Sequence, residues 1–438
     1  PAWSSVSTLN IDTKDTMKKQ VYQWLASVVL LALTISGYAE LPLSEQKVKS
    51  HTYTTLDEVK DYLSKRGFVE TRKQDGVLRI AGDVRARWLY FREDIKNPSD
   101  KDKYNPLPVN RYRSEFYLYI DYRAERNWLS SKMNWTAIAG GENTAAGVDI
   151  NRAFLGYRFY KNPETRTDFF MEIGRSGLGD LFESEVQFQS NFDGLHIYWT
   201  RELSKDYPYQ VIVHGGPFVV NMTKKHYAWV VEGILNRLPK QFFVKCSVVD
   251  WNTFVPSETS TTEKAATNAM KYKYCVWQWL VGKHSQVPWI NGQKKPLYLY
   301  GAFLMNPLAK ATKTTLNGKE NLAWFIGGTL GGLRKAGDWS ATVRYEYVEA
   351  LSVPEIDVSG IGRGNLLKFW FAQAIAANYD PKEANGFTNY KGFSALYMYG
   401  ITDSLSFRAY GAYSKPANDK LGSDFTFRKF DLGIISAF

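Results

Sequence analysis

Arginines of this chain recur at every second position in short segments. In LRIAGDVRARWLYF (78–91) and RYRSEFYLYIDYR (111–123), charged residues alternate with apolar ones. The full row comprises Arg79, Arg85, Arg87, Arg111, Arg113, Arg123, Arg152, Arg158 and Arg175. Like charges held on one confined surface raise the local concentration of anions, so the row predicts a surface that attracts anionic solutes. Asp83, Glu115 and Asp121 share the row, and the alternative is a salt-bridged scaffold without ionic selectivity.

The alternation itself predicts β-strands with two different faces. Segments of about ten residues match membrane-spanning strands, which must close into a barrel because an open edge would leave unpaired backbone groups in hydrocarbon. A soluble β-helix or β-sandwich is the alternative. Seventeen segments alternate, but 365–379 is apolar at helical spacing and is assigned to a loop, 349–391. An antiparallel barrel of 16 strands over residues 77–438 follows, with 14 or 18 as alternatives.

The beginning of the sequence carries an export signal. Met17 and two lysines precede the apolar run VYQWLASVVLLALTI, and small residues lead to Ala39. This pattern predicts a signal peptide over Met17–Ala39, preceded by residues 1–16, and therefore a protein exported by a Gram-negative cell. Residues 40–76 form a polar periplasmic leader, in which Thr55 and Glu58 cap a short helix that ends near Gly67.

The end of the chain, FRKFDLGIISAF, is an alternating strand. It resembles the signal that barrel-assembly machinery reads in outer-membrane proteins: Asp431, Gly433 and Phe438 fit, whereas Ser436 occupies a usually apolar position.

Four further segments resemble an outer-membrane porin family of Gram-negative bacteria, including its chlamydial-type members: EIGR (172–175), SNFDGLHIYW (190–199), AGDWSATVRYEYVEA (336–350) and residues 390–414. The resemblance implies a passive diffusion channel in the outer membrane for small hydrophilic solutes and, as in many 16-stranded porins, a homotrimer. The arginine row adds the expectation of a mild preference for anions, and no cofactor is expected. It also implies that the third outer loop, here 176–192, folds inward. Its acids Asp180, Glu183 and Glu185 would then face the arginine row, unless the loop is a solvated surface loop.

Other functions fit the sequence less well. The five histidines, His51, His196, His214, His226 and His284, form no recognisable catalytic or metal-ligand spacing, so an enzyme is not expected. Export argues against nucleic acid as the partner of a chain with 55 Lys and Arg against 44 Asp and Glu. A surface adhesin is the main rival, because 92–110, 252–270 and 349–391 are long and polar.

Two cysteines, Cys246 and Cys275, flank a polar stretch that would connect adjacent strands. In an oxidising compartment they could form a disulfide, or they could remain free thiols.

Overall fold

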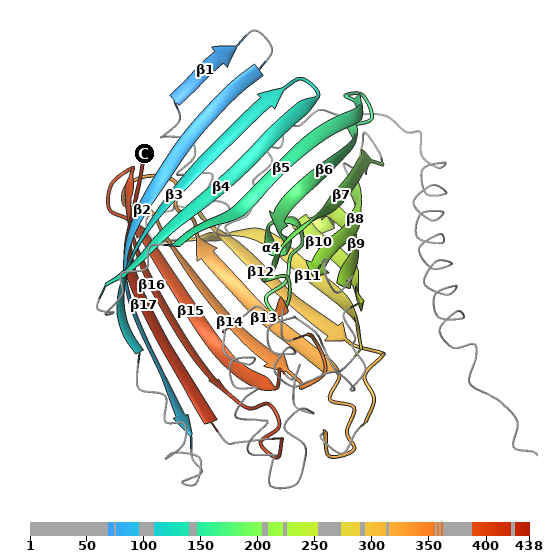
Figure 1. Cartoon of the computed structure of the whole chain (residues 1–438), viewed down its shortest axis with the longest axis vertical. Helices are drawn as coiled ribbons and strands as arrows, with labels where there is room; N and C mark the ends of the chain where they lie inside the picture. The colour runs from blue at the N-terminus through green and yellow to red at the C-terminus, as the bar shows by residue number, and fades with distance from the viewer. Residues whose placement is uncertain are drawn as a thin grey trace, which may run out of the picture.

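The computed structural model describes residues 69–73, 76–95, 109–139, 147–203, 209–221, 226–252, 273–289, 294–311, 315–354, 357–358, 361, 388–421 and 425–438. Within this part, sixteen antiparallel strands, β2 to β17, each pair with the next, and β17 pairs with β2 to close a barrel (Figure 1). The predicted all-β barrel of 16 strands is confirmed. None of the described helices is long and apolar enough to cross a membrane.

In the described residues, two short helical segments, α4 and η1, lie between the strands. Their bounds are β1 Val69–Lys73, β2 Gly76–Ile95, β3 Val109–Ala124, β4 Asn127–Ala139, β5 Gly147–Asn162, β6 Thr167–Gly177, α4 Leu178–Leu181, β7 Asn191–Glu202, β8 Gln210–Asn221, β9 His226–Leu238, η1 Pro239–Gln241, β10 Phe242–Asn252, β11 Tyr274–Pro288, β12 Lys294–Met305, β13 Leu322–Gly331, β14 Trp339–Val348, β15 Tyr390–Gly400, β16 Leu405–Lys415 and β17 Phe425–Ala437.

The two faces of the barrel differ in chemistry. Large apolar side chains on the outer face are among the most exposed of the molecule, for example Ile326, Val343 and Ile434. Side chains at the alternate positions of the strands point inward and are polar or buried, as Thr329 and Ile435 illustrate. An apolar outer surface on a closed barrel is the arrangement that hydrocarbon surroundings require.

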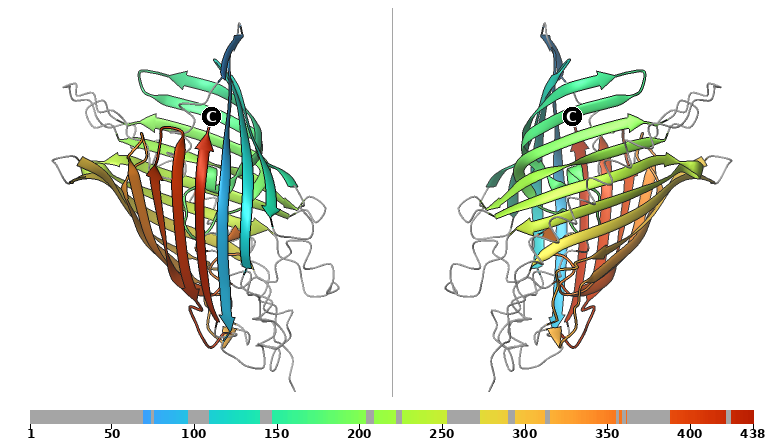
Figure 2. Two further views of the ribbon diagram at one scale, coloured as in Figure 1. Left: turned by 90° about the vertical axis from the view of Figure 1, so that its left-hand side faces the viewer. Right: turned by 90° about the vertical axis from the view of Figure 1, so that its right-hand side faces the viewer.

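The last strand closes the barrel against the first. The pairing runs from Phe425 opposite Ile95 to Ala437 opposite Asp83, and Figure 2 shows the red strand beside the blue one. Phe438 adds a final rung, since its N–H and carbonyl both bond to Gly82, at 3.0 and 3.1 Å. Its ring covers Gly82, where a Cβ would come within 2.5 Å of the ring, and stacks on Phe116. A side chain at position 82 would therefore displace the terminal phenylalanine.

The short strand β1 continues this seam beyond the chain end. Val69 lies opposite Ile80 on β2, the strand that also pairs with β17. Residues 69–73, expected to be part of a helical leader, are thus a strand. The predicted signal peptide, the helix over 55–67 and the segment 365–379 lie outside the described residues, as do most of the long connections on which an adhesin function would depend.

The cysteines lie on adjacent strands, as expected, but they are free. Cys246 is opposite Trp279 and Cys275 is opposite Asp250, so the two positions are four residue pairs apart along the β10–β11 ladder. This offset amounts to about 13 Å, which is too far for a disulfide. The disulfide alternative is therefore wrong.

The outer face can be tested with a charge. Ile326→Lys places an ammonium group on the apolar face of β13 and should lower the free energy of unfolding in lipid vesicles by about 2–4 kcal/mol. Thr342→Lys, on the inner face of the neighbouring strand β14, is the matched control and should cost less. Equal losses in urea titrations of the two variants would contradict the assignment of faces.

Candidate functional site

A continuous chain of ion pairs crosses the closure seam on the inner face. Arg113 contacts Glu115 at 2.8 Å, and Glu115 accepts a hydrogen bond from Arg87 at 3.1 Å. Arg87 also pairs with Asp431 on β17, and Arg408 on β16 reaches the same carboxylate at 2.7 Å. The chain therefore joins four adjacent strands, β3, β2, β17 and β16. Asp431, expected to serve assembly recognition, is also a structural acceptor inside the barrel.

A second group lies beside this chain. Arg85 binds Asp83 at 2.5 Å and its guanidinium lies 4.1 Å from the centre of the Tyr117 ring. The Tyr119 hydroxyl donates to Asp83 at 3.0 Å. The Tyr117 ring and the Asp83 carboxylate, itself held by the Tyr119 hydroxyl, therefore fix the position of this arginine.

Solvent reaches the cations of this wall and not its acids. The side chains of Arg85, Arg87 and Arg113 are 17, 20 and 36% exposed. Those of Asp83, Glu115 and Asp431 are only 1–3% exposed. The buried carboxylates neutralise part of the positive charge of the arginines. The groups of this wall that solvent can contact are therefore the guanidinium groups. We call the inner face of β16, β17 and β2 to β5 the basic wall.

Of the six remaining arginines of the row, five point into the barrel and Arg175 points outward. Arg79, Arg111, Arg123, Arg152 and Arg158 have the inward register of the basic wall. Arg158 pairs with Asp168 at 2.9 Å.

Arg175 is the exception, and its expected inward direction is wrong. It lies three residues after the inward Glu172, an odd offset, and therefore shares the outer face with Ile173. There it pairs with Asp193 at 2.8 Å.

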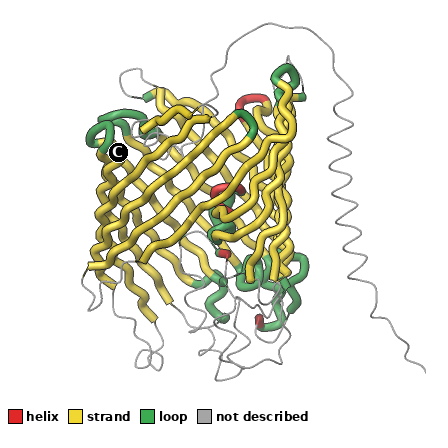
Figure 3. Tube along the Cα trace, turned by 45° about the horizontal axis from the view of Figure 1, so that its top comes forward, coloured by secondary structure: helices red, strands yellow, loops and turns green. Residues whose placement is uncertain are grey.

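The segment after β6 folds into the barrel, as Figure 3 shows. It begins with α4 and runs to residue 190; we call 178–190 the inner loop. Leu178, Phe182, Val186 and Phe188 are at most 2% exposed and pack with inward side chains of β8 to β14, such as Phe218. Burial of four large apolar side chains seats the loop on the wall opposite the basic wall.

The acids of the inner loop bind that same far wall. Glu183 contacts Lys245 of β10 at 2.5 Å and accepts from the Tyr298 hydroxyl. Glu185 pairs with Arg344 of β14 and accepts from Tyr300 at 2.7 Å. The expectation that Glu183 and Glu185 face the arginine row is therefore wrong, because nearer cations on β10 and β14 take them. Asp180 is exposed on the loop.

The connection between β14 and β15 also contacts the inner loop, through Asp357. Asp357, between β14 and β15, is fully buried and accepts hydrogen bonds from the backbone N–H groups of Phe188 and Ser190, at 2.9 and 3.1 Å. Its own carbonyl accepts from Gln189. Burial without a cation raises the pKa of Asp357 to about 7, although the N–H donors act in the opposite direction.

Four titratable side chains form a hydrogen-bonded row beneath the inner loop. Glu172 meets His196 Nδ1 at 3.2 Å, His196 Nε2 meets His214 Nδ1 at 3.1 Å, and His214 Nε2 meets Glu232 at 3.0 Å. Phe182 stacks on His214. With both carboxylates ionised, the three contacts need one protonated imidazole. His196 and His214, which formed no recognisable pattern in the sequence, are both part of this row.

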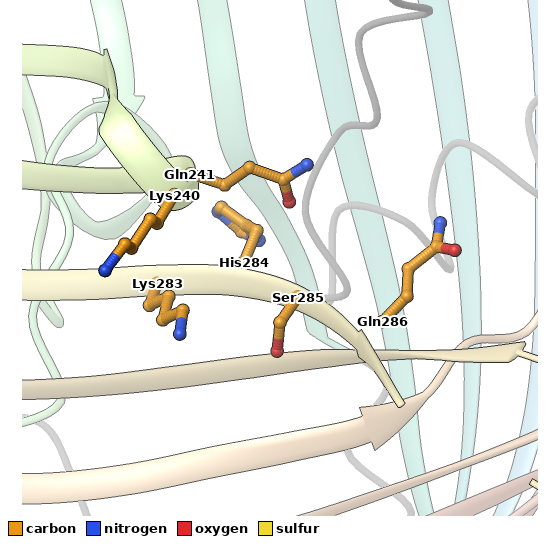
Figure 4. A pocket seen from close by; sticks show the side chains of 6 residues that line it. All are labelled: Lys240, Gln241, Lys283, His284, Ser285 and Gln286. Atoms are coloured by element: carbon orange, nitrogen blue, oxygen red, sulfur yellow. The ribbon is translucent and has the colours of Figure 1, made fainter. Parts of the chain in front are cut away.

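A pocket of about 410 Å³ opens beside the turn η1 (Figure 4). Its lining is cationic and amide-rich: Lys240, Gln241, Lys283, His284, Ser285 and Gln286. No cluster of three or more His, Cys, Asp or Glu side chains suited to a metal ion occurs in the described ranges.

Three cationic residues of the inner face were not among the predicted site residues. Lys132, Lys245 and Arg408 lie on the inner face by register. Their alternation with apolar neighbours was a usable signal. No local pattern indicates that Asp357 contacts a loop more than 160 residues away.

Comparisons with known proteins give structural neighbours only. No family model and no curated protein matches the sequence. The high-pH structure of Pseudomonas putida OprB has a TM-score of 0.47 and 13% identity, covering 87% of this chain and 97% of that chain. Salmonella typhi OmpF in complex with daunomycin has a TM-score of 0.44 and 11% identity, covering 84 and 100%. A triple mutant of the Rhodopseudomonas blastica porin has 0.38 and 8%, covering 82 and 100%.

The acid contacts of the inner loop generate one prediction. Glu183→Gln with Glu185→Gln removes two charges that bind Lys245 and Arg344, so the loop should leave its seat more often. Cleavage by chymotrypsin after Phe182 or Phe188, followed by mass spectrometry, should become roughly tenfold faster, equivalent to about 1.4 kcal/mol of seating energy. Asp180→Asn, on the same loop but exposed, is the control. Unchanged cleavage in the double variant would show that apolar packing alone holds the loop.

Asp357 generates a pH prediction. Since its pKa is about 7 when folded and about 4 when unfolded, the native state holds a proton that the unfolded state releases between these values. Stability contributed by this group is complete below pH 4 and is lost as the pH rises through 7, by up to about 1.4 kcal/mol per pH unit. The free energy of unfolding should therefore fall more between pH 5 and pH 7.5 for the wild type than for Asp357→Asn, which has no carboxyl group to titrate at this position. The exposed Asp419→Asn should follow wild type; an Asp357→Asn curve parallel to wild type would refute the assignment.

Proposed function

We propose that this chain is an outer-membrane porin: a passive diffusion channel for small hydrophilic solutes with a mild preference for anions. The observation that carries the proposal is the basic wall, where partly exposed guanidinium groups accompany buried carboxylates inside a closed barrel. Solutes would pass between this wall and the inner loop, whose apolar side and acids are turned towards β8 to β14.

The arrangement of charges accounts for a mild preference. Each acid behind the wall cancels part of a cation's long-range potential, while short-range contacts with a passing solute involve guanidinium groups. The preference for anions would thus depend mainly on the exposure of the guanidinium groups to solvent, and less on the net charge of the wall. The same ion pairs join neighbouring strands, so the wall would serve both ionic selectivity and barrel stability.

The proposal includes three partners. Outer-membrane lipid would cover the apolar outer face, and barrel-assembly machinery would read the strand that ends at Phe438. A homotrimer is supported by the Arg175–Asp193 pair on the outer face, since charged side chains there favour contact with another subunit or polar headgroups over hydrocarbon.

Reversal potentials under a KCl gradient test the proposal. Wild-type protein in planar bilayers should give an anion-selective reversal potential. Replacing Arg85, Arg87 and Arg113 with Gln should shift selectivity towards cations, because Asp83 and Glu115 lose their nearest cations. Arg175→Gln, on the outer face, should leave the potential unchanged. An unchanged potential in the triple variant would refute the role of the basic wall.

A further inference from the structure

The pocket beside η1 lies at the end of the barrel where the chain reaches Phe438. In this antiparallel barrel the odd-numbered strands all end on the same side, and β9 leads into η1 as β17 leads to Phe438. The volume of about 410 Å³ falls within the range of roughly 300–1,000 Å³ that is usual for ligand sites. Lys240, Gln241 and Gln286 are exposed, so a ligand at the barrel rim can reach the lining of the pocket.

The lining of this pocket is cationic and contains no acid. Lys240 and Gln241 come from the turn η1, and Lys283 and Ser285 come from β11 (Figure 4). The Lys283 ammonium group lies 5.2 Å from the centre of the Phe242 ring. Two ammonium groups beside an amide and a hydroxyl favour an anionic ligand with several acceptor oxygens, such as a phosphate ester.

Acids near the turn contact other cations. Glu202, at the end of β7, pairs with Arg166 at 2.7 Å and with Arg237, which precedes η1. In the part of the chain that the structure describes, no carboxylate lies within ion-pair distance of Lys240 or Lys283. An anion in the pocket would therefore not compete with a carboxylate of these residues for the two lysines.

The pocket adjoins the apolar outer face of the barrel. Along the outer face of β11, Trp279 and Val281 are 36 and 48% exposed, and Lys283 is the next outward residue. Lys283 is opposite Phe242 on β10 and Leu299 on β12, and Leu299 is also exposed. A cation at the border of an apolar face is placed for lipid head groups. A ligand with a phosphate and acyl chains would use both surfaces, whereas a free phosphate would use only the lysines.

Strand parity separates this pocket from the interior of the barrel. Lys283 and Ser285 alternate with the inward His284 and therefore face away from the interior. The His284 ring stacks on the inward rings of Phe243 and Tyr298, with centroids 5.6 and 4.8 Å away. A solute inside the barrel would thus not meet the Lys283 ammonium group, but a lipid outside the barrel would.

We propose that Lys240 and Lys283 bind the phosphate group of an anionic phospholipid from the membrane leaflet at this end of the barrel. Gln241 and Ser285 would donate to phosphate or glycerol oxygens, and the acyl chains would lie along the apolar outer face of β11 and β12. The proposal rests on the part of the proposed function that places the barrel in a lipid membrane, and it does not depend on conduction through the barrel.

Native mass spectrometry of the refolded protein tests this site by titration with dioleoylphosphatidylglycerol or dioleoylphosphatidylcholine in detergent. The wild type should bind the anionic lipid several-fold more tightly. Lys240→Gln with Lys283→Gln should weaken binding of phosphatidylglycerol about tenfold or more, because both ammonium groups are lost. Lys161→Gln with Lys335→Gln removes the same charge from exposed positions at the same end of the barrel and should leave binding unchanged. Lys240→Arg with Lys283→Arg should preserve it.

Two results would overturn the lipid site. One is equal affinity for phosphatidylglycerol in the wild type and in the Lys240→Gln, Lys283→Gln variant, both verified as folded by heat-dependent migration in gels. If the double variant does not fold, the two single variants decide, and unchanged affinity in both would have the same consequence. The other is equal affinity of the wild type for the two lipids, which would remove the requirement for an anionic head group.

Two further results identify the ligand and separate the site from the channel function. Inorganic phosphate that displaces phosphatidylglycerol with similar affinity would assign the pocket to free phosphate and overturn the lipid proposal. Selective binding of phosphatidylglycerol, lost in the Lys240→Gln, Lys283→Gln variant of a barrel that conducts no ions, would support the site and contradict only the channel function.

Discussion

The pairing of the last strand with the first is the constraint on which the structure depends. In hydrocarbon no water can satisfy a free strand edge, so a sheet with this apolar outer face is stable only when closed. Closure extends to the terminal residue, where Phe438 forms the last rung with Gly82. On the inner side, Asp431 binds Arg87 across the seam. The Arg87–Asp431 ion pair therefore joins the first strand of the barrel to the last, and it also neutralises part of the positive charge of the interior.

Closure divides the interior into two unlike halves. The inner loop fills the half against β8 to β14 with buried aromatic and aliphatic side chains, and Glu183 and Glu185 bind cations on that side. The other half keeps its arginines accessible to solvent. The loop therefore occupies one side of the interior and keeps Glu183 and Glu185 on that side, so neither of these carboxylates contacts the basic wall.

Period-2 alternation predicted most of the fold because each strand separates lipid from the interior, and a strand slipped by one residue would expose charge to lipid. It predicted the inward direction of residues such as Arg85 and Arg113. It failed for Arg175, where the number of residues from the inward Glu172 is odd. Strand parity required an even number, because both ends of such a barrel lie on one side, and the assignment of 365–379 to a loop reduced the count from 17 to 16.

Contacts between distant segments could not be predicted from the sequence. The partners of Glu183 and Glu185 depend on where the inner loop is seated, and that depends on apolar packing against strands far along the chain. The same holds for Asp357, which binds backbone N–H groups and leaves no side-chain pattern. A β-bulge at Asn151, where Lys132 is opposite Arg152 but Met133 is opposite Ile150, likewise follows only from the pairing of β4 with β5.

Single-channel recording of the refolded protein in a planar bilayer tests the central claim most directly, namely that the closed barrel leaves a water-filled path along the basic wall. We predict discrete, uniform conductance steps in symmetrical KCl. A verified, folded barrel that gives no steps would contradict this claim and would show that the inner loop and the outer connections seal the interior.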